Sequence, residues 1–178
     1  FINYTSVEHD PKALEEVEKF WKAGYLAKFT SLDECRTFIG GDPILSKLAM
    51  ITKEKNGRIK RRLVLDAKRS GIVKASTLTK RILLPRVVDA VHDHLDLSAI
   101  AEPWEEVEMF ILDFLDAFWQ LPNHPEERRF FVIKIAGMYF VYLRTAQGTR
   151  NAPTTWGRFA ALVCRLTQSL FCSGEVRL

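Results

Sequence analysis

Apolar residues recur three or four positions apart in four segments, which predicts helices over residues 11–23, 31–39, 85–95 and 152–170. The first has a typical start, because Asp10 can cap it and Pro11 occupies the first helical position. Gly24 and Gly40 stand where the first two helices would end. The fourth helix is the longest, and Trp156 on its apolar face is predicted to lie in the core.

Two pairs of apolar runs predict antiparallel hairpins: residues 48–52 with 62–66, and residues 130–136 with 138–144. The first pair flanks Asn56-Gly57, a strong signal for a tight turn, and the second flanks Gly137. Residues 107–114 are β-branched and aromatic, which predicts a buried strand. Helices and strands are mixed without a regular βαβ repeat, so the predicted class is α+β.

Length and composition fit one globular domain, or one domain with an appendage. The chain has 178 residues, of which 47% are hydrophobic and 27% charged, close to the average for proteins that fold around a core. No apolar run approaches the roughly 20 residues that a membrane helix needs, and no signal peptide is evident. Cys35, Cys164 and Cys172 are too few and too irregular for a disulfide framework or a zinc site. We therefore expect a soluble protein with free thiols and no membrane partner, in the cytoplasm or nucleus.

The net charge of +4 is unevenly distributed. Residues 51–81 contain eleven basic and two acidic side chains, a balance of +9, which leaves the rest of the chain at −5. Such a segment can be a solvated basic hairpin or a surface that binds a polyanion. The motifs that follow it favour the second interpretation.

Two short motifs could carry chemistry. Asp113 ends the predicted strand 107–114, and a carboxylate in that position can hold a metal-bound phosphate at the edge of a sheet, with Asp116 three residues later. Gln147-Gly148 precedes the last helix, where free backbone N–H groups suit an anion. Taken alone, each motif is better explained by a structural role, as a capped turn or a helix-entry loop.

In this order, the basic hairpin, Leu84-Pro85-Arg86, the Asp113 motif and the Gln147 motif resemble the reverse transcriptases of retrotransposons and retroviruses. The resemblance covers about residues 48–171. It implies a polymerase fingers-palm fold of the reverse transcriptase type, with the whole chain 1–178 forming one partial domain. The implied fingers are residues 1–86 and 120–146, and the implied palm is residues 87–119 and 147–178.

The resemblance also implies roles for individual residues. Asp113 matches the first metal-binding aspartate, and Phe114 would offer its backbone carbonyl to the same metal. Phe118 matches the aromatic residue that stacks under the incoming sugar and selects deoxynucleotides. Asp116 and Ala117 would line that pocket, mainly through the backbone.

Four further positions would contact the incoming nucleotide. Gln147 and Gly148 match the Gln-Gly pair of the family, although Ala146 stands where many relatives have Pro. Arg62 matches the arginine that lies over the base and phosphates. Lys53 or Lys55 matches the lysine that reaches the terminal phosphate, with a preference for Lys53.

The implied reaction is two-metal nucleotidyl transfer, in which two Mg²⁺ ions about 4 Å apart clamp the attacking and leaving oxygens. The implied partners are an RNA or DNA template–primer and deoxynucleoside triphosphates. The second catalytic motif of the family, an aromatic-x-Asp-Asp sequence, does not occur in these 178 residues. We therefore expect little or no polymerase activity from this chain alone. The alternative is a non-catalytic nucleic-acid-binding remnant of a retroelement, in which the hairpin binds backbone and the aspartates cap turns.

Overall fold

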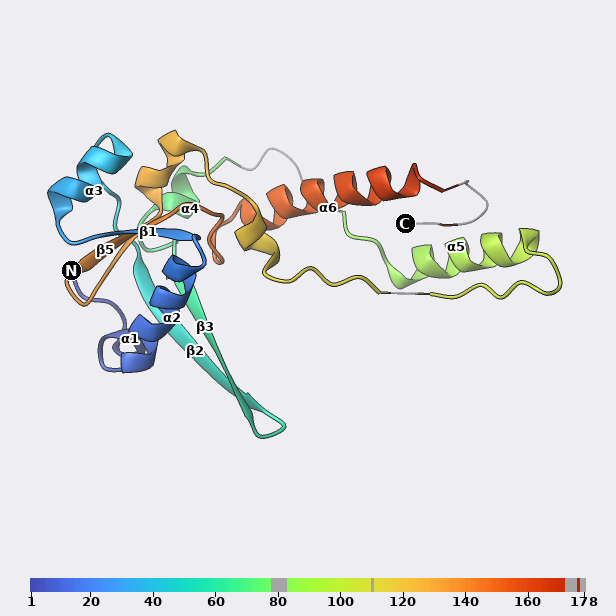
Figure 1. The fold of residues 1–178 in the computed structure, drawn as a ribbon, viewed down its shortest axis with the longest axis horizontal. Helices are drawn as coiled ribbons and strands as arrows, with labels where there is room; N and C mark the ends of the chain where they lie inside the picture. Colours follow the sequence, from blue (N-terminus) through green and yellow to red (C-terminus); the bar gives the residue numbers. More distant parts are fainter. Residues whose placement is uncertain (78–82, 110, 172–175, 177–178) are drawn as a thin grey trace. The chain divides into compact units, whose positions relative to one another are not determined.

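The computed structural model describes residues 1–77, 83–109, 111–171 and 176, and its elements are shown in Figure 1. The chain divides into two compact units. Unit 1 comprises Phe1–Leu78 and Asp116–Ala152, and unit 2 comprises Thr79–Leu115 and Pro153–Leu178. Lys80 and Arg81 of the basic segment, and Cys172, lie outside the described residues. The mixture of helices and strands confirms the α+β class.

A three-stranded antiparallel sheet forms the centre of unit 1. Its strands are β1 (Leu26–Phe29), β4 (Val132–Ile135) and β5 (Met138–Tyr142), in the order β1-β5-β4. The predicted hairpin around Gly137 is therefore confirmed, and both Ala136 and Gly137 have the positive φ that a tight two-residue turn needs. The strand β1 was not predicted. It pairs with β5 in the register Leu26↔Tyr142, so the sheet joins segments more than a hundred residues apart.

The first two predicted helices are present and begin at the expected caps. Helix α2 (Pro11–Lys22) starts where the Asp10 side chain accepts a hydrogen bond from the Lys12 amide, and α3 (Leu32–Ile39) starts with a reciprocal capping box between Ser31 and Glu34. Thr30 and Ser31 donate hydrogen bonds to the Glu34 carboxylate, and these lower its pKa. Unit 1 also contains the shorter helices α1 (Thr5–Glu8) and α4 (Ile72–Ala75) and the 3-10 helices η1 (Ala117–Gln120) and η2 (Pro125–Phe130).

The predicted basic hairpin is longer than expected. Strands β2 (Lys47–Lys55) and β3 (Arg58–Asp66) pair over their full length, from Lys47↔Asp66 to Lys55↔Arg58. Asn56 and Gly57 both have positive φ, as the two-residue turn requires. In Figure 1 the two strands leave the body of unit 1 as a narrow arm. The turn signal therefore sets the register of every pair in the hairpin.

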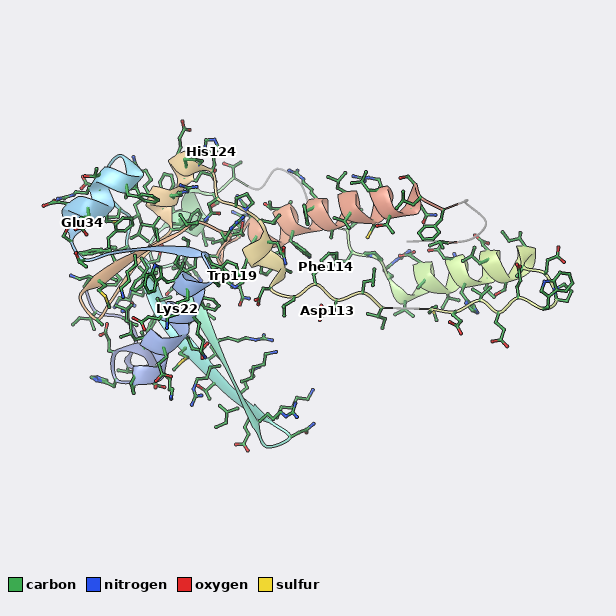
Figure 2. All side chains as sticks on the ribbon, viewed as in Figure 1. Lys22, Glu34, Asp113, Phe114, Trp119 and His124 are labelled. Atoms are coloured by element: carbon green, nitrogen blue, oxygen red, sulfur yellow. The ribbon has the colours of Figure 1, made fainter. Side chains whose placement is uncertain are left out.

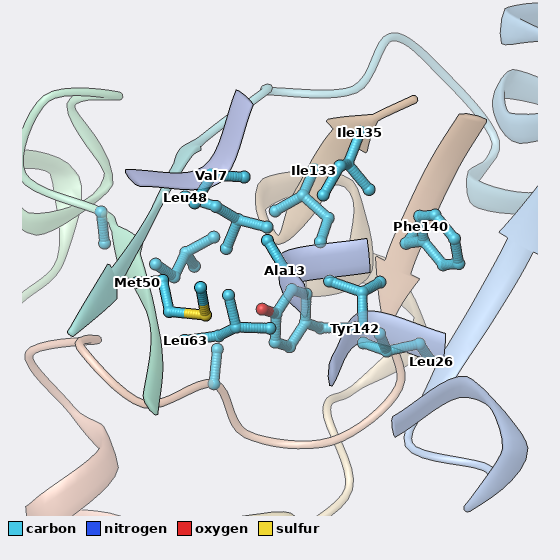
Figure 3. Packing of buried hydrophobic residues seen from close by; sticks show 14 of the residues in the cluster. Val7, Ala13, Leu26, Leu48, Met50, Leu63, Ile133, Ile135, Phe140 and Tyr142 are labelled. Carbon is cyan, nitrogen blue, oxygen red and sulfur yellow. The ribbon is translucent and has the colours of Figure 1, made fainter. Parts of the chain in front are cut away.

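One hydrophobic core joins the base of this hairpin to the three-stranded sheet. Figure 3 shows Leu48, Met50 and Leu63 of the hairpin packed with Ile133 and Tyr142 of the sheet. Phe140, Ile133 and Leu48 are completely buried, and Val17 of α2 is 1% exposed. This packing fixes the root of the arm and leaves its outer half exposed.

Polar contacts also hold the root of the hairpin. The buried Asn3 side chain accepts a hydrogen bond from the Leu48 amide and donates one to the Lys134 carbonyl, so it links β2 to β4. The Tyr4 hydroxyl and the Arg69 amide donate to the Asp66 carboxylate, which lowers the pKa of that carboxyl. These bonds anchor both strands where they enter the core.

Unit 2 contains the helices α5 (Val87–Ile100) and α6 (Ala152–Gln168), apart from the first residue of α6. Helix α5 runs five residues beyond its predicted end. The Trp156 ring contacts Phe114 at 5.1 Å and Phe159 at 5.5 Å between centroids. Among the described residues, no helix is long and apolar enough to cross a membrane.

The prediction of a buried strand at residues 107–114 is wrong. The described residues of this segment, 107–109 and 111–114, form no strand, and Ile111 is 95% exposed. A strand needs a neighbour to satisfy its backbone N–H and C=O groups and to cover its apolar face. Both sheets of the described chain are made by β1 to β5, and none of these strands pairs with residues 107–114.

Candidate nucleotide-binding site

The outer half of the hairpin separates its charges between two faces. Residues paired across antiparallel strands point to the same side, and successive residues of a strand alternate. The register therefore places the pairs Ile51↔Arg62, Lys53↔Lys60 and Lys55↔Arg58 on one side. We call this side the cationic face, and its charged members are Lys53, Lys55, Arg58, Lys60 and Arg62.

The opposite face of the hairpin has a different character. It begins in the core with the pairs Leu48↔Leu65 and Met50↔Leu63 and continues outward with Thr52↔Arg61 and Glu54↔Ile59. Glu54, the acidic residue of this outer half, therefore lies on the side away from the cationic face. The buried root fixes which residues point to each side, because a slip by one residue would exchange the two faces.

Like charges directly opposite each other across two strands are unfavourable. Lys53 faces Lys60 and Lys55 faces Arg58, and none of these four forms an ion pair with an acidic residue of the described chain. All four are exposed, so water and salt weaken their repulsion. A bound polyanion would attract all four side chains and so offset their mutual repulsion. This face therefore suits phosphate groups.

The Gln147-Gly148 loop packs against the root of the cationic face. Gly148 has a φ of +99°, and a β-carbon at this position would lie 2.6 Å from the Leu65 carbonyl oxygen and 3.4 Å from Cγ1 of Val64. Val64 points to the same side of β3 as Arg62, two residues further along. Only glycine allows this approach, so Gly148 brings the loop against β3. Gln147 beside it is half-buried.

A 3-10 turn contains two of the residues that were predicted to form the sugar pocket, Ala117 and Phe118. The turn η1 (Ala117–Gln120) follows Asp116, which has a left-handed conformation with φ 52° and ψ 39°. Asp tolerates this conformation better than most residues. Ala117 and Phe118 are half-buried, whereas Trp119 is 5% exposed and belongs to the core of unit 1.

Asp113 and Phe114 belong to unit 2 and not to unit 1. Figure 2 labels both on the segment before η1, where Asp113 is exposed and the Phe114 ring packs on Trp156. Among the described residues, no three His, Cys, Asp or Glu side chains are grouped so as to hold a metal. A single carboxylate with a backbone carbonyl does not complete a two-ion magnesium site, since Mg²⁺ requires six oxygen ligands.

The structure therefore brings some of the predicted site residues together. Within unit 1, Lys53, Lys55 and Arg62 share one face of the hairpin, and Gly148 contacts the strand that carries Arg62. Sequence reasoning did not single out Lys60 and Arg58 as members of the same face. The signal was present, because a two-residue Asn-Gly turn determines which residues lie opposite each other.

Comparisons with known proteins agree at the level of fold. No protein-family model matches the chain, and no curated protein matches it in sequence. The solved structure of the prototype foamy virus protease-reverse transcriptase matches with a TM-score of 0.56 and 19% identity, over 94% of this chain and 19% of that chain. The foamy viral protease-reverse transcriptase dRH in complex with double-stranded DNA matches with a TM-score of 0.56 and 17% identity, over 94% of this chain and 24% of that chain.

The chain thus spans about a fifth to a quarter of the length of these two structures. At this identity the likeness concerns the fold. It agrees with the resemblance drawn from the order of the sequence motifs. The chain therefore has a mixed α+β fold similar to part of a retroviral protease-reverse transcriptase.

Proposed function

We propose that this chain is part of an RNA-directed DNA polymerase, and that unit 1 binds the incoming deoxynucleoside triphosphate and the backbone of a template–primer. The observation that carries the proposal is the cationic face, five basic side chains on one side of a hairpin with the Gln147-Gly148 loop packed at its root. Phosphoryl transfer depends on positioning and charge stabilisation more than on covalent chemistry by the protein. Cations around a triphosphate supply both.

The register favours Lys53 over Lys55 as the lysine that reaches the triphosphate. Arg62 lies diagonally across from Lys53, because Lys53 pairs with Lys60 and Arg62 is two residues further along the same face. Diagonal positions are about 7–8 Å apart, within reach of two long side chains that converge on one ligand. Lys55 is one pair further from Arg62, so it is better placed for a template or primer phosphate.

The remaining roles rest on the resemblance. Phe118 would lie under the sugar of the nucleotide, with Asp116 and Ala117 lining its pocket. Asp113 and the Phe114 carbonyl would contribute to a Mg²⁺ site, which the described residues do not complete. When bound, Mg²⁺ would neutralise phosphate charge. One of the structural neighbours was solved with double-stranded DNA, which is consistent with template–primer as a partner here.

Binding of a nucleotide opposite a template base tests the proposal. With a template–primer bound, the protein is expected to bind the complementary deoxynucleoside triphosphate more tightly than a non-complementary one. Gln147→Ala is expected to weaken that binding about tenfold, the value of a hydrogen bond to a charged group. Isothermal titration or fluorescence anisotropy measures it, and His124→Ala, an exposed change elsewhere in unit 1, serves as the control.

The alternative, a nucleic-acid-binding protein without a nucleotide site, is supported by one observation. A cationic face is sufficient by itself for backbone binding, which needs no carboxylate and no metal. That alternative predicts equal binding of complementary and non-complementary nucleotides and an unchanged affinity in Gln147→Ala. A preference for the complementary nucleotide excludes it.

A further inference from the structure

The Trp119 side chain lies at the centre of an aromatic stack in unit 1. Its ring centroid is 4.5 Å from that of Phe20 on α2, 5.1 Å from that of Tyr25 and 5.6 Å from that of Tyr142 on β5. The Tyr25 and Tyr142 rings are within 12° of parallel to the indole. Burial raises the pKa of Tyr142, so its phenol stays neutral. Three aromatic rings of unit 1 therefore fix the plane and position of the indole.

Backbone hydrogen bonds connect Trp119 to the rest of η1. The Trp119 amide donates to the Asp116 carbonyl at 2.8 Å, and the Leu121 amide donates to the Phe118 carbonyl at 3.2 Å. Beyond the turn, the Thr145 amide donates to the Leu121 carbonyl at 2.8 Å. The turn is thus tied at its end to the segment that follows β5.

The geometry of a 3-10 helix links Trp119 to its neighbour. With three residues per turn, successive side chains point about 120° apart around the axis. Once the indole is held in the core, the helix fixes the direction in which the Cα–Cβ bond of Phe118 leaves the backbone. Phe118 is half-buried, so it lies at the border between core and solvent.

We propose that Trp119 is a positioning residue that aims the Phe118 ring, and that it thereby sets the preference for a deoxyribose over a ribose sugar. This inference rests on the proposed function, because it takes Phe118 as the residue under the sugar. It adds that selectivity depends on a buried ring that does not touch the nucleotide. Discrimination by steric contact needs a ring held to within a fraction of an ångström, which a mobile Phe118 could not provide.

The positioning itself can be tested without any nucleotide. In protein labelled with ¹³C-phenylalanine, and with Phe118 assigned through Phe118→Leu, the Phe118 ring is expected to give one sharp set of NMR signals. Trp119→Leu is expected to broaden or split those signals, whereas Trp119→Phe keeps an aromatic ring in the stack and restores them. Phe140→Leu, a fully buried ring on β5, is the control for a general loss of packing. An unchanged Phe118 signal in Trp119→Leu would overturn the inference.

The selectivity is tested by the ratio of affinities for a deoxynucleotide and the matching ribonucleotide. Trp119→Leu is expected to lower this ratio by about fivefold, as the energy of an aromatic pair implies, and Phe140→Leu to leave it unchanged. Equal loss of both affinities in the two variants would show that Trp119 acts only in stability. If the unchanged protein bound neither nucleotide, the proposed function and the selectivity role would both fail, while the NMR result would still decide the positioning.

Discussion

Removal of four charges from the cationic face is expected to weaken binding of a double-stranded template–primer by roughly a hundredfold at low salt. The substitutions are Lys53→Gln, Lys55→Gln, Arg58→Gln and Lys60→Gln. Each lysine or arginine that contacts a phosphate of the template–primer releases about one counterion. With Lys53 assigned to the nucleotide, the slope of log K against log salt should fall by about three units. Anisotropy titrations at several salt concentrations measure both quantities.

Loss of overall charge also weakens nucleic-acid binding, so a charge-matched control is needed. Unit 1 carries four exposed basic residues on α2 and α3 that can be changed together: Lys12→Gln, Lys19→Gln, Lys22→Gln and Arg36→Gln. This control should change the salt slope by less than one unit. Similar losses in the two variants would mean that the cationic face is not the binding surface.

Gly148→Ala is expected to have the largest effect of any single small substitution in unit 1. A β-carbon would lie 2.6 Å from the Leu65 carbonyl oxygen, which belongs to the backbone of a paired strand at its buried root and cannot easily move aside. The φ of +99° is unfavourable for alanine as well. Together these costs amount to about 3 kcal/mol, unless the loop shifts away from β3 and carries Gln147 with it. Urea unfolding and nucleotide titration report the two outcomes.

Gly137→Ala separates the cost of backbone strain from that of the close approach. Gly137 has a φ of +77° in the turn between β4 and β5, and nothing lies within 4 Å of a β-carbon built there. That variant should lose only about 1 kcal/mol and keep its affinity for nucleotide. If Gly148→Ala were no more harmful than this control in stability and in binding, the contact with β3 would be unimportant.

The parts of the fold that depend on local signals could be predicted from the sequence. Asp10, Ser31 and Asn56-Gly57 act within a few residues of themselves, through caps and a turn, and each is found where it was expected. The same turn determines the register of the hairpin and hence the cationic face. The two turn residues Asn56 and Gly57 were therefore enough to predict which side chains share the cationic face.

Features that depend on distant partners could not be predicted. The strand β1 is four residues long and includes a lysine, so its pattern is weak, and it exists because β5 offers an edge more than a hundred residues away. Residues 107–114 show the opposite case. Their composition suits a strand, but composition measures how well side chains fit a sheet and not whether a neighbouring strand is present.

The aromatic residues divide in the same way. Trp156 was expected in a core because it lies on an apolar helix face. It contacts Phe114 and Phe159 in unit 2, but it is only half-buried and belongs to neither of the two buried clusters of the described residues. Trp119 showed no comparable signal, since one turn of 3-10 helix has no period to detect. Its partners on α2 and β5 lie far from it in the sequence. The candidate site was thus predictable in its charges and motifs but not in the packing that supports it.

The most direct test of the central claim compares two adjacent arginines on opposite faces of β3. Arg62→Gln and Arg61→Gln remove the same charge one residue apart, and only Arg62 lies on the cationic face. With template–primer bound, Arg62→Gln is expected to weaken binding of the complementary deoxynucleoside triphosphate by about tenfold or more, the value of a charge-assisted hydrogen bond. Arg61→Gln should weaken it less than about threefold, through long-range electrostatics alone. Equal affinities in the two variants would contradict a nucleotide site on this face.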